Sequence, residues 1–283
     1  MEKQSQREIK KEQWKEIAKA WASFVPPTKP SKNEIKFWEK ELKKLPIKKG
    51  INFKALVLGS TPEFRDLLSK YRIDTTFVDI NSDSARAMTS LLKVAKNPRE
   101  KFVLSDWLHM PFSKNSFDLV LSDSAQDNIK YSEFKPFFKN IFSILKPKGL
   151  WFFGAVNVKK NDLLTFEQYI NLYKKSPEIF KDQMNYWLNF FRLCYNPEFY
   201  NEKTKTYSFK KVNDKIKKII KNGSLSEKAI KDIGFGLDYQ QVLISEQDFK
   251  KIIKKYFEVA DEYQDKSHPA MKIKWTAILK SKK

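Results

Sequence analysis

The sequence has a single cysteine, Cys194, and only two histidines. One cysteine excludes an internal disulfide framework and a cysteine-rich zinc site. Long apolar runs are also missing: Leu150–Val156 is far shorter than the about 20 residues that a membrane-spanning helix needs. The charged N-terminal stretch lacks the apolar segment of a secretory signal peptide. These absences predict a cytoplasmic protein with no membrane partner and no metal site.

Arginine is scarce as well, although the formal net charge is +21. Only six of the 55 basic residues are Arg, leaving 49 Lys. Such a charge is compatible with nucleic acid as a partner, but readers of phosphates and bases favour the bidentate guanidinium of Arg. A solvated lysine-rich surface is therefore preferred, and nucleic acid stays a less favoured alternative. At 283 residues with 41% hydrophobic content, one globular domain with additions is expected.

The chain is organised around a strand, a tight turn and a helix. Lys54–Leu58 is a short apolar run that ends at Gly59, as in a strand buried on both faces. Pro62 suits the first position of a following helix, with Ser60 or Thr61 as its N-cap. This unit points a helix N-terminus at a polar or anionic ligand.

A second apolar strand, Thr75–Val78, ends in Asp79, an acid placed for ribose hydroxyls. Only one of the usual three glycines of a dinucleotide site is present, and Glu63 in the first helical turn would repel a pyrophosphate. A cofactor with a ribose but no phosphate fits this turn better. S-adenosylmethionine is such a cofactor.

Later strands carry further polar residues at their ends. Asp106 and Trp107 follow the third strand, where they could bond the adenine amino group and stack on its ring. Asp123 follows the fourth strand, at the sheet edge where ligands bind. The predicted fold is an α/β, doubly wound Rossmann-like sheet. Its remaining strands are predicted at Phe102–Leu104, Phe117–Leu121, Leu150–Val156, Phe257–Tyr263 and Lys272–Leu279.

In this order of motifs, roughly residues 10–157 resemble class I S-adenosylmethionine-dependent methyltransferases. Leu58–Glu63 stands at the glycine-rich first motif, Asp79 at the ribose-binding acid, and the pair at 106–107 at the adenine-contacting position. A narrower similarity is to a subgroup with Leu-Gly-x-Thr-Pro-Glu in the first loop, which also carries two N-terminal tryptophans and a Pro-Pro-x-Arg/Lys-Pro-Ser element. The resemblance implies a seven-stranded sheet whose last strand is antiparallel.

The resemblance also implies a set of site residues. Val57 replaces the acid that usually precedes the first glycine, so the methionine ammonium needs other partners, for which the Leu58 and Ser122 carbonyls with Glu63 or Asp123 are candidates. Asp123 and His109 are the candidate catalytic residues, although Asp123 could serve only the methionine end and His109 could be an ordinary loop residue. The predicted cofactor-binding residues are Leu58, Gly59, Ser60, Thr61, Glu63, Asp79, Ile80, Asp106, Trp107, Ser122 and Asp123.

Three segments are expected. Residues 1–48 form an N-terminal helical extension, either a cover for the sheet edge or a lid that brings Trp21 and Lys29 to the site. Residues 49–159 and 251–283 form the methyltransferase core. Residues 160–250 form an aromatic helical insert, which either shapes an acceptor pocket or packs as a plain cover.

The predicted activity is methyl transfer to an oxygen or nitrogen acceptor by in-line displacement, a reaction in which the protein mainly positions the acceptor and excludes water. A small molecule is the favoured acceptor. The alternatives are a methyltransferase acting on nucleic acid or protein, and an inactive S-adenosylmethionine-binding module. Ser122–Ala125 stands where amino-group methyltransferases of nucleic acids carry Asn/Asp-Pro-Pro-Tyr/Phe, which argues against the first of these. The sequence does not indicate an oligomeric state.

Overall fold

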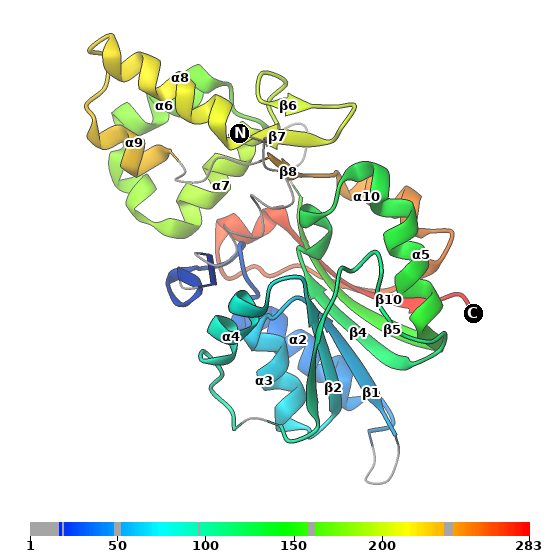
Figure 1. Cartoon of the computed structure of the whole chain (residues 1–283). Helices are drawn as coiled ribbons and strands as arrows, with labels where there is room; N and C mark the ends of the chain where they lie inside the picture. The colour runs from blue at the N-terminus through cyan, green and yellow to red at the C-terminus, as the bar shows by residue number, and fades with distance from the viewer. Residues whose placement is uncertain (1–16, 19, 48–51, 96, 158–161, 235–239) are drawn as a thin grey trace, which may run out of the picture.

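The computed structural model describes residues 17–18, 20–47, 52–95, 97–157, 162–234 and 240–283, built around one seven-stranded sheet (Figure 1). The strand order is β3-β2-β1-β4-β5-β10-β9, with β10 antiparallel to both of its neighbours and β1 to β5 parallel. The predicted doubly wound sheet is therefore confirmed. Its strands are β1 (Lys54–Leu58), β2 (Asp74–Asp79), β3 (Glu100–Leu104), β4 (Phe117–Asp123), β5 (Leu145–Val156), β9 (Phe257–Tyr263) and β10 (Lys274–Ser281).

Two layers of helices cover the sheet (Figure 1). Because side chains alternate along a strand, Ala55 and Val57 of β1 pack on one face while Leu56 and Leu58 pack on the other. The first face is covered by α2 (Lys32–Lys43), α3 (Pro62–Lys70) and α4 (Ser82–Thr89). The second face is covered by α5 (Phe134–Ile144) and α10 (Glu246–Ile253).

The helix starts follow local capping chemistry, with one correction. Ser31 and Glu34 form a full capping box at α2. At α3, however, neither Ser60 nor Thr61 caps with its side chain, because the Ser60 hydroxyl donates to Asp79 instead. Asn81 caps α4 by accepting from two backbone amides of its first turn.

Two predicted boundaries move. The fifth strand, predicted at Leu150–Val156, begins at Leu145 and includes Pro147 and Gly149, and its pairing with β4 is irregular there. The last strand, predicted from Lys272, begins at Lys274 because Pro269–Ile273 forms a 3₁₀ helix, η6. Of the predicted helical extension, residues 1–16 lie outside the described residues, and Trp21–Ser23 forms a 3₁₀ turn, η1. No helix among the described residues has the length and apolar character needed to cross a membrane.

The insert has its own hydrophobic core. The aromatic side chains Tyr169, Phe190, Tyr207 and Phe209 are almost fully buried within it. The sequence did not predict its three-stranded sheet, since strands of two or three residues show no alternation. Its elements are α6 (Phe166–Lys175), η5 (Pro177–Lys181), α7 (Gln183–Cys194), β6 (Tyr200–Asn201), β7 (Thr206–Ser208), α8 (Phe209–Lys221), α9 (Lys228–Ile233) and β8 (Gln240–Val242).

A buried ion pair joins α3 to the edge strand β3. The Arg65 guanidinium donates to both carboxylate oxygens of Glu100, at 2.8 and 2.7 Å, and to the Thr89 hydroxyl at 2.9 Å. The Arg65 and Glu100 side chains are 0% and 1% exposed. Arg65 also lies over the Phe77 ring. Removing either charge would leave the other buried without its counter-ion.

We expect Arg65→Met to lower the free energy of unfolding by about 3–5 kcal/mol, because Glu100 would stay buried and uncompensated. The double variant Arg65→Met/Glu100→Met should regain much of this loss. Lys70→Met is the matched control on the same helix, because Lys70 is largely exposed and its surface pair with Glu39 is screened by water and contributes little to stability. Urea unfolding of the four proteins measures the differences; equal losses for Arg65→Met and Lys70→Met would contradict the assignment.

Candidate active site

The larger cavity lies at the carboxyl ends of β1, β2 and β4 and has a volume of about 220 Å³. Its wall brings together residues that the sequence placed far apart. Nine of the eleven predicted cofactor-binding residues line it: Leu58, Gly59, Ser60, Thr61, Asp79, Ile80, Asp106, Trp107 and Asp123. The topology explains this meeting, since parallel strands end at the same edge.

Gly59 turns the chain between β1 and α3. Its φ is +86°, a left-handed conformation that favours glycine. A Cβ at this position would lie 3.7 Å from the Trp107 ring. The single glycine is therefore needed for its backbone angle, with the indole close by.

Asp79 closes the end of β2 and is held from two sides. Its carboxylate accepts from the Ser60 hydroxyl at 2.8 Å and from the Asn81 backbone amide at 3.0 Å. Burial raises the pKa of Asp79, and the hydrogen bonds from Asn81 and Ser60 oppose that rise. The carboxylate is thus positioned on the cavity wall, with lone pairs available for hydroxyl groups.

Trp107 is fixed by a hydrogen bond from its indole Nε1 to the Val78 carbonyl at 2.9 Å. Asp106 accepts from the Leu108 amide at 3.0 Å, which shapes the turn after β3. The indole therefore forms a rigid apolar wall beside Gly59 rather than a mobile surface group.

Ser84 and Met88 of α4 also line the cavity, and the sequence analysis missed both. Each side chain is almost fully buried. Among the described residues, no hydrogen-bond partner reaches the Ser84 hydroxyl oxygen. The Asn81 cap at the start of α4 was the only sequence signal that this helix begins at the site.

Three predicted residues lie elsewhere. Both Glu63 carboxylate oxygens accept from the Trp21 indole at 3.3 Å, and Glu63 is outside the cavity lining. The Ser122 hydroxyl is buried against Trp151, from whose Nε1 it accepts at 2.9 Å. His109 is exposed in the turn after Trp107, and the structure does not bring it to either cavity.

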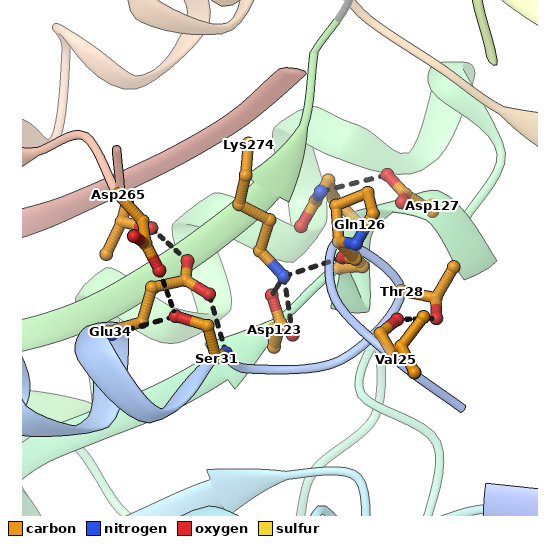
Figure 2. Close-up of polar contacts among 12 residues, drawn as sticks. Val25, Thr28, Ser31, Glu34, Asp123, Gln126, Asp127, Asp265 and Lys274 are labelled. Carbon is orange, nitrogen blue, oxygen red and sulfur yellow. Dashed lines mark hydrogen bonds and ion pairs between the residues drawn. The ribbon is translucent and has the colours of Figure 1, made fainter. Parts of the chain in front are cut away.

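Asp123 forms a buried ion pair that the sequence did not reveal. The Lys274 ammonium of β10 lies 2.6 and 2.8 Å from the two carboxylate oxygens of Asp123 (Figure 2). The Lys274 side chain is 1% exposed and the Asp123 side chain is 3% exposed. Lys274 also donates to the Pro27 carbonyl at 2.9 Å. Burial raises the pKa of Asp123 to about 6, and the nearby ammonium opposes the rise. Burial alone would lower the pKa of Lys274, but the charges of Asp123 and Glu34 raise it.

A smaller cavity of about 90 Å³ lies between the sheet and the insert. It shares Trp21, Asp123 and Asn128 with the larger cavity, so the two cavities adjoin at these residues. Trp187 and Phe191 of α7 and Phe209 of α8 form its insert side. Some insert aromatics fill its core, and these three line a cavity.

Asp127 is the second buried acid in the lining of this cavity, and the sequence analysis did not select it. It lies in the 3₁₀ turn η2 (Ala125–Asn128) and accepts from Gln126 at 2.9 Å and Gln241 at 3.5 Å. Within the described part of the chain it forms no ion pair. Burial raises the pKa of Asp127 to about 8, assisted by the Asp123 charge. The signal was its place four residues after Asp123, just beyond a strand end.

We expect Lys274→Met to destabilise the fold by about 3–5 kcal/mol, because Asp123 would lose its counter-ion in a buried site. Adding Asp123→Asn should restore a large part of the loss. Lys280→Met on the same strand is the control, since Lys280 is 41% exposed. Chemical unfolding followed by circular dichroism gives the comparison, and a Lys274→Met protein as stable as the control would refute the role of the pair.

Asp127 should make stability depend on pH. The folded protein keeps its proton up to about pH 8, whereas the unfolded chain releases it near pH 3.8. Between these values the folded state binds more protons, so the contribution of Asp127 to stability falls with rising pH by at most about 1.4 kcal/mol per pH unit. Asp127→Asn removes this term. Its stability relative to the wild type should therefore be higher at pH 9 than at pH 5; an unchanged difference would argue against a buried, protonated Asp127.

Comparisons with known proteins agree with this geometry. Residues 56–149 match a family model described as a methyltransferase domain. No curated protein matches the chain. The solved structure of the PH0226 protein from Pyrococcus horikoshii is similar with a TM-score of 0.54 at 17% identity, covering 93% of this chain and 98% of that one.

Two further structures share the fold. The 1,6-didemethyltoxoflavin-N1-methyltransferase of Burkholderia thailandensis, solved with its substrate and S-adenosylhomocysteine, gives a TM-score of 0.53 at 9% identity over 100% of this chain and 93% of that one. A Rhodobacter sphaeroides protein, named as a zinc-dependent alcohol dehydrogenase, gives 0.58 at 13% identity over the full length of both chains. At these identities the likeness shows the fold alone, which both kinds of enzyme can use.

The family match therefore carries the assignment that the fold alone does not. It spans β1 to the start of β5, including the Gly59 turn, Asp79 and the pair Asp106–Trp107. Residues 56–149 match a methyltransferase domain, and they lie in a sheet with the topology of the class I Rossmann-like fold.

Proposed function

We propose that this methyltransferase binds S-adenosylmethionine in the larger cavity and transfers its methyl group to a small molecule. The observation that carries the proposal is the wall formed by Gly59, Asp79 and Trp107 at the strand ends. The first loop, Leu58–Glu63, has the Leu-Gly-x-Thr-Pro-Glu motif and would place the protein in the subgroup that carries it. The proposed location is the cytoplasm.

The residues of the larger cavity fit the parts of this cofactor. Asp79 offers a fixed carboxylate to the two ribose hydroxyls, and charge-assisted bonds of this kind are the stronger ones. Trp107 and Met88 offer apolar contact to a planar base. The Ser84 hydroxyl is buried on the same wall and would gain a hydrogen-bond partner from a polar ligand.

When bound, the cofactor supplies an electrophilic methyl carbon on a sulfonium, so the protein needs no nucleophile of its own. Asp123 is positioned between the two cavities by Lys274 and would face the sulfonium end of the ligand. Trp21 borders both cavities and is held by Glu63, which supports the idea that the N-terminal extension acts as a cover that excludes water.

A small acceptor is favoured over a macromolecule by the shape of the second cavity. Its volume of about 90 Å³ and its aromatic lining suit a single ring or short chain. The insert at 160–250 would be the acceptor-side cover, with the core at 49–159 and 251–283. A nucleic-acid acceptor rests on net charge alone.

The proposal is tested by calorimetric titration with S-adenosylhomocysteine, with NAD⁺ as the control ligand. Binding of the first alone supports the assignment. A preference for NAD⁺, or no binding of either, would overturn the assignment of the larger cavity.

Asp79→Ala should weaken S-adenosylhomocysteine binding by about tenfold to a hundredfold, because charge-assisted hydrogen bonds are each worth ~1.5–3 kcal/mol. Asp74→Ala is the matched control, since Asp74 begins the same strand at its other end. The same titration measures both variants. Wild-type affinity in Asp79→Ala would remove Asp79 from the site.

A further inference from the structure

Two acids border the smaller cavity, but only one is neutralised by an ion pair. Both oxygens of Asp123 are within 2.8 Å of the Lys274 ammonium. Asp127, four residues later, accepts from the side-chain amides of Gln126 and Gln241, and a hydrogen bond from the Ser124 hydroxyl lowers its pKa. These partners carry no charge, so when Asp127 ionises they do not neutralise it.

The remaining wall is rich in aromatic faces. Trp187 and Phe191 lie stacked, with ring centroids 5.6 Å apart and an interplanar angle of 27°. Phe209, Trp21 and Phe24 complete the aromatic lining. Aromatic faces attract cations, most strongly where water is excluded. An acid beside such faces favours a cationic ligand and disfavours an anionic one.

We propose that the smaller cavity takes the methyl acceptor, that this acceptor is a small amine, and that Asp127 holds its amino group. The inference rests on the proposed function, since it names the acceptor class for the same site. Because the linings of the two cavities share Trp21, Asp123 and Asn128, an amine held in the smaller cavity would lie next to a cofactor held in the larger one.

The protons and electrons balance without any further reactant. Asp127, which is protonated in the empty cavity up to about pH 8, releases its proton to solvent when an ammonium enters and pairs with it. The bound ammonium then gives one proton back to the Asp127 carboxylate and becomes a neutral amine. The nitrogen lone pair then forms a bond to the methyl carbon as the carbon–sulfur bond breaks, and that electron pair goes to sulfur. The positive charge moves from sulfur to the methylated nitrogen, which the aromatic faces and the Asp127 site can accommodate. The raised pKa of Asp127 suits a group that accepts a proton near neutral pH.

Three ligands with the same ring but head groups of different charge can distinguish an amine acceptor from the competing acceptor classes. Benzylamine, benzyl alcohol and benzoate differ in a cationic, a neutral and an anionic head group on the same ring. Each is titrated calorimetrically into the full-length protein saturated with S-adenosylhomocysteine, so that only the smaller cavity is open. The variant is Asp127→Asn, which keeps the shape and removes the charge. Asp261→Asn is the matched control, because Asp261 is exposed on β9.

We expect the wild type and Asp261→Asn to bind benzylamine roughly tenfold or more tightly than benzyl alcohol, and to bind benzoate least. Asp127→Asn should lose the preference for the amine while keeping its affinity for the alcohol and for S-adenosylhomocysteine. Retained alcohol binding would show that the variant is folded and its cavity intact.

Three results would overturn the inference while leaving the proposed function in place: equal binding of amine and alcohol, preference for benzoate, or no binding of any probe to a protein that binds S-adenosylhomocysteine. An amine preference that survives in Asp127→Asn would remove Asp127 from the role. Failure to bind S-adenosylhomocysteine at all would instead contradict the proposed function.

Discussion

The site depends on one buried cation, the Lys274 ammonium. It comes from β10, the strand that runs against the others, and neutralises Asp123 at the end of β4. Its hydrogen bond to the Pro27 carbonyl ties the N-terminal segment to the sheet. Since a buried charge is tolerated only with a partner, the last strand, the fourth strand and the segment before α2 must be in register for this group to be satisfied.

Two further acids, Glu34 and Asp265, also fix the N-terminal segment against the sheet. The Thr276 hydroxyl donates to Glu34, and the Ser31 hydroxyl donates to Asp265 at 2.6 Å, so the first turn of α2 is joined to β10 and to the loop before it. These contacts link residues more than two hundred positions apart. They hold the chain between residues 24 and 31 beside the smaller cavity, which Phe24 and Thr28 line, and they place Trp21 where it borders both cavities. The N-terminal extension is therefore part of the site wall, whether or not it also opens and closes.

The sequence predicted the sheet well because its signals are local. Apolar runs that end in Gly59 or Asp79 mark strands and their ends, and alternation marks β9 and β10. It could not predict the Asp123–Lys274 pair, because a lysine in an alternating strand looks the same whether it faces solvent or a carboxylate in the core. Asp127 was missed for a similar reason: its burial is imposed by the insert, through β8 and α7, and not by its neighbours in the chain. Ser60 was predicted as an N-cap of α3, but its hydroxyl donates to the Asp79 carboxylate and does not bond the helix backbone.

The first loop, Leu58–Glu63, is built with one glycine. Gly59 supplies the left-handed turn, and side chains fix the rest: Ser60 bonds Asp79, and Glu63 bonds Trp21. Glycine-rich loops leave the backbone open so that phosphates can approach it, whereas here side chains occupy that space and place a negative charge at the start of α3. A pyrophosphate would meet Glu63 at this helix end, but a ribose needs only the Asp79 carboxylate and an apolar wall. The scarcity of glycine in this loop therefore restricts the range of cofactors to those without a pyrophosphate, and it does not remove the binding site.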